Sequence, residues 1–306
     1  MKKVSIIMPK WIGDYIMALS VVEQFRVESG ATVSLLTANY LVGLAKMLTD
    51  MEIITYKSED GLTKCRDGLF DELYILPKSI STAIWGKKTG IPVRVGYKKE
   101  GRSPLLTRAL PRVNRDKRAH ITTEYCNLLD VKEYSIDRVS GVHISDKREE
   151  YVVLCPGAKY GPTKQWPFYS KFIDKYLKGK KIILLGSQAE SLYADMLVKE
   201  NSSFDIDNRC GKGTLEDAAT IISNAKVIIS NDSGLMHLSA YLNRKTIGIF
   251  GSTSPAWTRP IGNNSIVVNS SIACSPCFDR ECKFGHYKCM EELSVDLLGG
   301  KIKALL

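Results

Sequence analysis

Four side chains that could bind or activate a ligand interrupt an apolar stretch at residues 227–242, VIISNDSGLMHLSAYL. The apolar run stops at Asn231-Asp232-Ser233-Gly234, and an apolar-periodic helix pattern that carries His237 follows. Backbone N–H groups at the start of a helix attract anions, Ser233 can donate to a phosphate oxygen, and Gly234 permits close approach. Asp and Ser are also preferred N-caps, and a helical His can simply pack in a core. The stretch alone therefore supports phosphate binding and helix capping equally.

Three other apolar runs end in loops of similar composition, CPGAKYGPTKQWP from residue 155, GSQAE from residue 186 and GSTSP from residue 251. These loops carry Gly157, Lys164 and Glu190. Ligands of open parallel sheets bind outside the carboxyl ends of the strands. Four such loops predict a site for a nucleoside diphosphate, in which Glu190 could reach a ribose hydroxyl. Neither a Walker A nor a G-x-G-x-x-G pattern is present, so ATPase and NAD functions have no motif support.

One carboxylate, Asp14, occupies the corresponding place in the first half, directly after Trp11-Ile12-Gly13. An aspartate at such a strand end could accept the proton of an attacking hydroxyl. The commoner role of this residue type in this context is the N-cap of a helix, here one that would begin at Tyr15.

The elements that position these residues follow one rhythm in both halves. Strands are expected at 4–8, 32–38, 53–56, 72–75 and 93–97, with a helix at 15–26 that Gly30 terminates. Strands at 150–158, 180–187, 226–232 and 245–252, separated by helix patterns, follow in the second half. Strand, helix, strand with these spacings implies parallel sheets. We expect two doubly wound, Rossmann-like α/β domains facing a central cleft, residues 1–147 and 148–306, with a charged linker at 145–150.

The positive charge of the chain is concentrated in one segment. Between Lys87 and Arg118, eleven basic residues stand against two acidic ones, which leaves nine of the chain's ten excess positive charges there. Such a field predicts an anionic partner, which could be nucleic acid, a lipid surface or a phosphorylated substrate. A hydrophobic content of 44% with 25% charged residues is typical of a globular protein. Because no apolar stretch is long enough for a bilayer and no signal-peptide cleavage site follows the first strand, we expect a cytoplasmic protein.

Four of the eight cysteines fall in CSPCFDRECKFGHYKC, which we call the cysteine segment, residues 274–289. The first two form a C-x2-C pair, half of a common zinc site, although the spacing to the others is not that of a standard finger. A structural zinc and free thiols are equally compatible with the pattern, and disulfides are disfavoured in a reducing compartment. The residues concerned are Cys274, Cys277, Cys282 and Cys289.

Taken together, PKWIGDYIMALSVVEQFR, LYILPKSISTAIWGKKTGIPVRVGY, CPGAKYGPTKQWP and NDSGLMHLSAYLNRKTIGIFGSTSP resemble the family 9 glycosyltransferases. The resemblance runs from about Val4 to Pro260. It implies a GT-B fold and metal-independent, inverting transfer of a heptose from ADP-L-glycero-D-manno-heptose. It further implies an acceptor in the heptosyl-Kdo inner core of lipopolysaccharide or lipooligosaccharide in Gram-negative bacteria, reached by peripheral contact at the cytoplasmic face of the inner membrane.

The resemblance also implies roles for individual residues. Asp14 matches the general base, Lys164 matches the lysine that neutralises the departing diphosphate, and Glu190 falls where an acidic residue holds the ribose. The remaining donor-binding positions are Gly157, Asp232, Ser233, Gly234 and His237. Residues expected to contact the anionic acceptor are Lys78, Lys98, Arg102 and His120.

Other functions remain compatible with the sequence. A GT-B enzyme with another donor or another inner-core acceptor, or a sugar-nucleotide epimerase, would need the same strand-end loops. A basic, zinc-containing nucleic-acid-binding protein is a different class. It is disfavoured because the basic segment lacks interleaved aromatic residues and no nucleic-acid-binding motif is present. We therefore expect no specific nucleic-acid partner.

Overall fold

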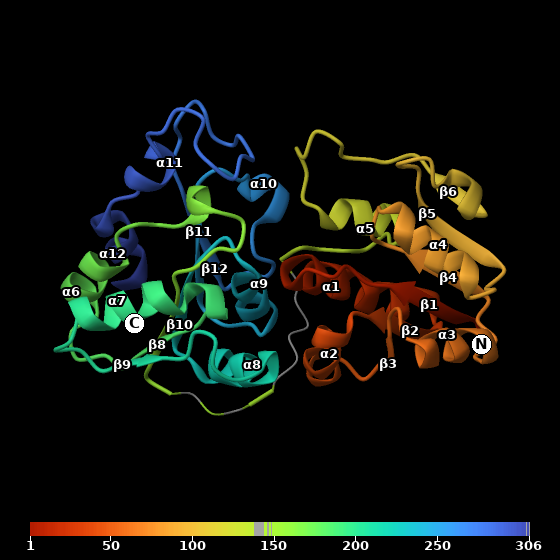
Figure 1. Ribbon diagram of the computed structural model, residues 1–306, viewed down its shortest axis with the longest axis horizontal. Helices are drawn as coiled ribbons and strands as arrows, with labels where there is room; N and C mark the ends of the chain where they lie inside the picture. The colour runs from red at the N-terminus through yellow and green to blue at the C-terminus, as the bar shows by residue number, and fades with distance from the viewer. Residues whose placement is uncertain (138–143, 146, 148, 304, 306) are drawn as a thin grey trace. The chain divides into compact units, whose positions relative to one another are not determined.

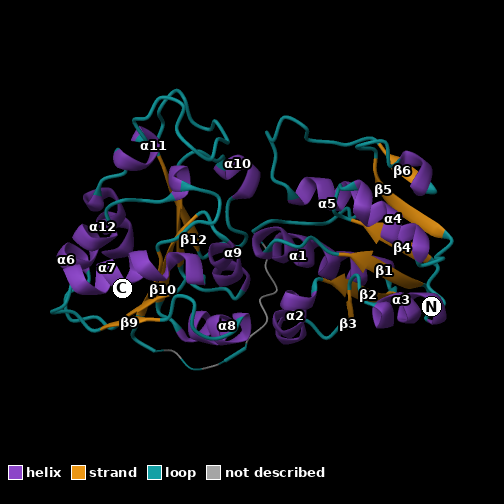
Figure 2. Ribbon diagram, in the orientation of Figure 1, coloured by secondary structure: helices purple, strands orange, loops and turns teal. Residues whose placement is uncertain are grey.

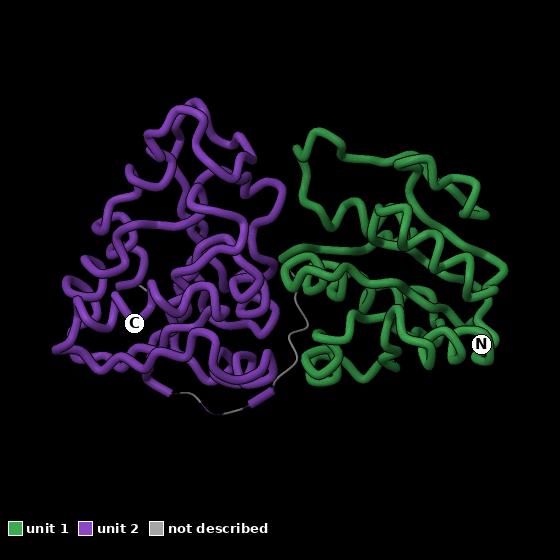
Figure 3. Tube along the Cα trace, viewed as in Figure 1, with its two compact units in different colours: residues 1–138 green, residues 139–306 purple. Residues whose placement is uncertain are grey.

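The computed structural model describes residues 1–137, 144, 145, 147, 149–303 and 305, and it divides into two compact units. Unit 1 comprises Met1–Arg138 and unit 2 comprises Val139–Leu306 (Figure 3). The division therefore falls a few residues before the boundary expected between residues 147 and 148. Asp146 and Arg148 of the expected linker lie outside the described residues.

Unit 1 is built on a sheet of six parallel strands in the order β3-β2-β1-β4-β5-β6 (Figures 1 and 2). The strands are β1 (Lys3–Ile7), β2 (Thr32–Thr37), β3 (Glu52–Thr55), β4 (Glu72–Ile75), β5 (Val93–Tyr97) and β6 (Arg108–Leu110). β1 pairs with β2 on one side and with β4 on the other, so the strand order reverses between β1 and β4. Such a switch point opens a crevice at the carboxyl ends of the two strands. Asp14, in the first turn of the helix after β1, and Lys78, in the loop after β4, follow these two strands.

The helices of unit 1 are α1 (Ile12–Ser29), α2 (Val42–Leu48), α3 (Glu59–Asp67), α4 (Ile80–Lys88) and α5 (Thr122–Leu129), with 3-10 turns η1 (Asn39–Leu41) and η2 (Ser103–Leu105). Gly30 terminates α1 as expected, in the left-handed conformation with φ 62°, and its N–H donates to the Arg26 carbonyl. The start of α1 differs from the expectation, because the helix begins at Ile12 and Trp11 is its N-cap residue. Asp14 therefore lies within the first turn, and its interpretation as an N-cap is wrong.

Unit 2 repeats the same topology in a second sheet of six parallel strands, in the order β12-β11-β10-β7-β8-β9. Its strands are β7 (Val152–Cys155), β8 (Ile182–Leu184), β9 (Ile206–Asn208), β10 (Val227–Asn231), β11 (Thr246–Phe250) and β12 (Ser265–Asn269). β7 pairs with β10 and with β8, so the switch point lies between β7 and β10. The expectation of two doubly wound α/β domains is thus confirmed for each unit.

The longer helices of unit 2 are α6 (Tyr169–Tyr176), α7 (Ser191–Glu200), α8 (Leu215–Asn224), α9 (Gly234–Tyr241) and α12 (Val295–Lys303). Short elements are η3 (Pro162–Lys164), η4 (Gln188–Glu190), α10 (Pro255–Thr258) and α11 (Lys288–Glu291). Trp166 anchors the core of this unit, since it is fully buried, packs edge-on against Tyr169 and Phe172, and donates its indole N–H to the Leu293 carbonyl at 2.7 Å. In the part of the chain that the structure describes, no helix is both long and apolar enough to cross a membrane.

Candidate active site

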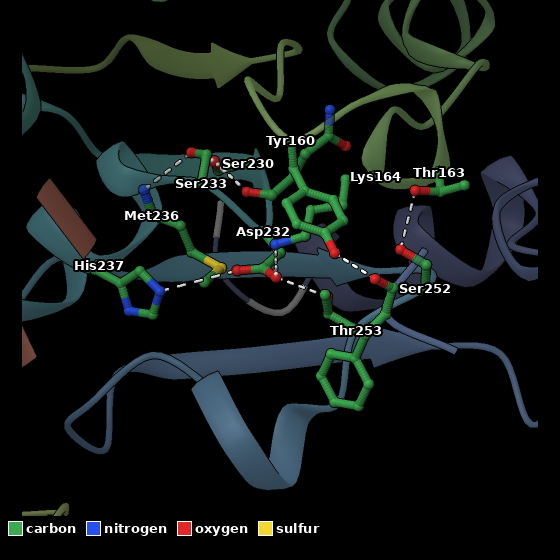
Figure 4. Close-up of polar contacts among 12 residues, drawn as sticks. Tyr160, Thr163, Lys164, Ser230, Asp232, Ser233, Met236, His237, Ser252 and Thr253 are labelled. Atoms are coloured by element: carbon green, nitrogen blue, oxygen red, sulfur yellow. Dashed lines mark hydrogen bonds and ion pairs between the residues drawn. The ribbon is translucent and has the colours of Figure 1, made fainter. Parts of the chain in front are cut away.

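The switch point of unit 2 gathers three side chains around one carboxylate, and we call these four residues the Asp232 cluster. Lys164, from the loop after β7, places its ammonium 2.5 Å from Oδ2 of Asp232, which follows β10. Thr253, from the loop after β11, donates its hydroxyl to the same oxygen at 2.6 Å. His237, on the first turn of α9, points its Nε2 toward the other oxygen at 3.8 Å (Figure 4). Three strand-end loops therefore converge on Asp232. The sequence predicted that Lys164, Asp232 and His237 would meet here, but it did not single out Thr253.

Asn231 fixes the spacing between the loops after β7 and β10. It is fully buried, and its side-chain amide donates to the Pro156 carbonyl at 2.6 Å. Its Oδ1 accepts from the Trp166 backbone N–H at 3.2 Å and lies 3.3 Å from the Tyr169 hydroxyl. Because all these bonds are buried, the loop that carries Lys164 cannot shift away from Asp232 without breaking several of them. The only sequence clue was an amide at the end of an apolar strand.

His237 is held neutral by its surroundings. Burial lowers the pKa of its imidazole to about 4; the Asp232 carboxylate opposes that shift and the Lys164 ammonium adds to it. The side chain is 4% exposed, and its Nδ1 is buried with no hydrogen-bond partner among the described residues. His237 therefore backs the Asp232 carboxylate as an uncharged group rather than presenting a positive charge to a ligand.

The start of α9 combines capping with a potential anion site. Ser233 is the N-cap residue: its hydroxyl accepts from the Met236 N–H at 3.5 Å and lies 2.9 Å from the Ser230 hydroxyl (Figure 4). Ser233 and Gly234 are half-buried. The first backbone N–H groups of a helix have no partner within the helix. The capping interpretation therefore holds for Ser233, while Asp232 is engaged by Lys164 and Thr253.

Gly157 and Glu190 meet between the loops after β7 and β8. The Glu190 carboxylate accepts from the Ser187 backbone N–H at 2.5 Å and from the Ser187 hydroxyl, which closes a capping box at η4. A Cβ atom at Gly157 would lie 2.0 Å from Cγ of Glu190. The glycine is therefore required because the glutamate side chain lies directly over the turn. Two residues that were assigned separately to the donor site thus contact each other.

In unit 1, a buried carboxylate organises the cations at the switch point. Glu124 on α5 is fully buried, forms an ion pair with Lys78 and accepts from Nε and Nη2 of Arg112 at 3.1 and 3.0 Å. Burial lowers the pKa of the Lys78 ammonium, while the carboxylates of Glu124 and Asp14 oppose this shift. Asp14 is thus near enough to Lys78 to interact with its charge. Neither Glu124 nor Arg112 had been singled out from the sequence.

The other residues expected to bind the acceptor have different environments. Lys98 is exposed at the end of β5, and His120 places Nδ1 2.9 Å from the Thr122 hydroxyl at the start of α5. Arg102 differs from the expectation because it is fully buried. Its Nε donates to the Tyr97 carbonyl at 2.7 Å and Nη1 donates to the Pro77 carbonyl at 2.6 Å. Arg102 therefore links the loops after β4 and β5 from inside and is not available to an acceptor.

The described residues of the cysteine segment show no grouped ligands for the zinc site that was considered for it. All four of its thiols are free, with Cys277 exposed and Cys289 buried. Among the described residues, no three or more His, Cys, Asp or Glu side chains are grouped so that they could hold a metal ion. The structural-zinc hypothesis is therefore unsupported by the described residues.

Two Rossmann-like units of this topology, each with charged groups at its switch point, are the architecture of the GT-B fold. The profile of glycosyltransferase family 9 (heptosyltransferase) matches residues 63–288, and the chain belongs to this family.

The chain is 27% identical to lipooligosaccharide heptosyltransferase 2 of Haemophilus influenzae, over 86% of this chain and 87% of the relative. The structure of Escherichia coli ADP-heptose lps heptosyltransferase II superimposes with a TM-score of 0.83 at 22% identity, over 100% of this chain and 98% of the other. Escherichia coli heptosyltransferase WaaC with ADP gives a TM-score of 0.73 at 18% identity, over 99% and 100% of the two chains. These superpositions establish the GT-B fold.

Proposed function

We propose that this glycosyltransferase transfers a heptose from ADP-L-glycero-D-manno-heptose to the heptosyl-Kdo inner core of lipopolysaccharide or lipooligosaccharide. The observation that carries the proposal is the junction of Lys164, Asp232 and the start of α9 at the switch point of unit 2. A lysine beside a helix N-terminus is the arrangement that stabilises a diphosphate without a metal ion. The choice of heptose and acceptor is supported by curated relatives such as the heptosyltransferase 2 of Haemophilus influenzae.

Unit 2 binds the donor in this proposal. Lys164 and the backbone N–H groups of Gly234 and its neighbours contact the diphosphate, and Glu190 accepts from a ribose hydroxyl. Gly157 keeps the space in which Glu190 lies. Asp232, Ser233 and His237 fix the loop, since they contact Lys164, Met236 and each other rather than open solvent.

Unit 1 binds the acceptor, with Asp14 as the general base. The acceptor hydroxyl attacks the anomeric carbon of the heptose as the bond from that carbon to the β-phosphate oxygen breaks, and the configuration inverts. The hydroxyl proton passes to the Asp14 carboxylate, and ADP departs with its new negative charge facing Lys164. The negative charge on the departing diphosphate develops only as the bond breaks. Its stabilisation by Lys164 therefore lowers the energy of the transition state relative to the bound donor.

The acceptor surface in this proposal consists of Lys78, which follows β4 at the switch point of unit 1, Lys98, which follows β5, and His120. Inner-core acceptors carry carboxylates and lie among lipid phosphates, so they match the excess positive charge between Lys87 and Arg118. The exposed part of that segment is also the expected contact with the cytoplasmic face of the inner membrane.

The test measures ADP release from ADP-heptose with two truncated lipopolysaccharides, one that carries the first heptose and one that lacks it. Release only with the heptose-bearing acceptor is the expected result. Release only with the heptose-free acceptor would assign the enzyme to the first heptose instead. Release with neither, from folded protein, would contradict the proposed substrates.

A further inference from the structure

The cysteine segment is hydrogen-bonded to two of the loops around the Asp232 cluster. The proposed transfer reaction assigns it no role. The hydroxyl of Thr163 donates to the Asp279 carbonyl at 2.6 Å. The Phe278 N–H donates to the Ser252 carbonyl at 2.7 Å, and the Ser275 hydroxyl donates to the Gly251 carbonyl at 2.6 Å. Residues 275–279 are therefore held against the loop after β7 and the loop after β11, the loops that supply Lys164 and Thr253.

The cysteine segment also lies close to the loop after β7 at Gly161 and Arg280. Gly161 has φ 142°, and a Cβ atom on it would lie 2.5 Å from the Arg280 carbonyl oxygen. Any side chain at residue 161 would therefore push Arg280 away, both by contact and by backbone strain. The glycine at residue 161, in the loop that carries Lys164, therefore leaves the space that the Arg280 backbone occupies.

The side chains of Lys164 and Arg280 share one aromatic ring. The ammonium of Lys164 lies 4.7 Å from the centroid of the Tyr160 ring, and the guanidinium carbon of Arg280 lies 5.2 Å from the same centroid. The Tyr160 hydroxyl donates to the Phe278 carbonyl, so the ring itself is tied to the cysteine segment. Both cations thus lie over the Tyr160 ring, at distances typical of cation–π contacts.

The charges around this ring favour an incoming anion. Lys164 is 12% exposed and pairs with Asp232. Two acidic residues are adjacent to Arg280 in the chain; Asp279 pairs with Lys283 at 3.0 Å, and Glu281 is exposed. Arg280 is exposed, and its guanidinium lies over the same ring as the Lys164 ammonium. A guanidinium in such a place can form two parallel hydrogen bonds to a phosphate, which an ammonium cannot do.

We propose that Arg280 is a second cation of the donor site, which binds the diphosphate together with Lys164, and that the cysteine segment serves to hold it there. The inference rests on the proposed function, because it assigns Arg280 to the same nucleoside diphosphate. The inference goes beyond the proposed function because it makes residues 274–289 part of the donor site.

The test is a calorimetric titration of the full chain with ADP, AMP and adenosine, using wild type, Arg280→Gln, Arg280→Lys and Lys288→Gln. Loss of a charge-assisted hydrogen-bonding partner should weaken ADP binding by roughly 10-fold or more in Arg280→Gln. Binding of adenosine should not change, and Arg280→Lys should recover only part of the loss. Lys288→Gln, which removes an exposed cation from the same segment, should bind ADP as wild type does.

Raising the salt concentration supplies a second readout that a merely structural arginine would not alter. ADP affinity should fall less steeply with salt in Arg280→Gln than in wild type, because one screened charge is gone. Equal ADP affinities and equal salt dependence in the two proteins would overturn the inference while leaving the donor site intact. A parallel loss of ADP and adenosine binding would also overturn it, since that pattern indicates damage to the loop. Failure of wild type to bind ADP would contradict the proposed function itself.

Discussion

The ammonium of Lys164 and the carboxylate of Asp232 lie 2.5 Å apart although 68 positions separate them in the chain. Both side chains are largely buried, at 12% and 5% exposure. Removing one partner of such a pair leaves the other charge uncompensated in the interior, which is costly. Lys164 therefore has a structural effect as well as its proposed role toward the diphosphate, and a single substitution would mix the two.

A double-mutant cycle separates these two effects. Lys164→Ala should destabilise the protein by about 3 kcal/mol, the cost of orphaning a buried charge, and should lower transfer by about 10²-fold, as loss of an electrostatic stabiliser does. Lys164→Ala combined with Asp232→Asn should regain most of the stability and none of the transfer. Urea unfolding and ADP release measure the two quantities. Full recovery of transfer in the double variant would limit Lys164 to a structural role.

Asp14→Asn tests the proposed base. The amide preserves the shape of the side chain in the first turn of α1 but cannot accept a proton, so kcat should fall by about 10²–10⁴-fold. ADP affinity should stay as in wild type, because Asp14 belongs to unit 1 and the proposed donor site to unit 2. If kcat is retained, Asp14 acts only through its favourable interaction with the helix N-terminus.

How far the site can be predicted from the sequence depends on whether a residue acts through its place at a strand end or through a tertiary contact. Lys164, Asp232 and Glu190 were predicted because each follows an apolar run, and the carboxyl ends of parallel strands meet at one edge of a sheet. Thr253 and Asn231 were missed because their roles depend on loops that are distant in the chain.

Charge was a less reliable guide than strand position. Arg102 was grouped with exposed cations because it lies in the basic segment, but backbone carbonyls at the ends of β4 and β5 surround it in the interior. A count of charges cannot reveal such burial, because the compensating acceptors are main-chain groups.

The strands that the sequence did not predict are edge strands. β6, β9 and β12 each lie at the end of a sheet, where one side of the strand is unpaired and the apolar pattern is correspondingly weaker. The central strands β1, β7 and β10 are covered on both faces by helices and are nearly uniformly apolar, which is why they were recognised.

Gly157→Ala tests whether the contact between Gly157 and Glu190 matters for the nucleoside. A Cβ atom would collide with Cγ of Glu190, so the glutamate must leave its position over the turn. Binding of adenosine and ADP should therefore weaken together, with little change in the thermal midpoint because a flexible side chain can move. Gly179→Ala is unsuitable as a control since its φ is positive, whereas Gly300→Ala meets no atom within 4 Å and should behave as wild type. Unchanged adenosine binding in Gly157→Ala would remove Glu190 from the nucleoside site.

The buried His237 predicts how stability depends on pH. Burial lowers its pKa in the folded protein to about 4, whereas an exposed histidine titrates near 6.5. Between these values the unfolded chain binds a proton that the folded chain does not, so this residue reduces stability as the pH falls from 6.5 to 4. At about 1.4 kcal/mol for each pH unit, the loss should approach about 3 kcal/mol.

Urea unfolding at a series of pH values should accordingly show a shallower decline for His237→Gln than for wild type across this range. The comparison uses slopes, so a uniform loss of stability in the His237 variant does not affect it. Identical slopes in His237→Gln and wild type would mean that the imidazole is protonated in the folded protein and pairs with Asp232 as a cation. In that case the Asp232 carboxylate would be shared by two positive groups, and Lys164 would be correspondingly easier to release to the diphosphate.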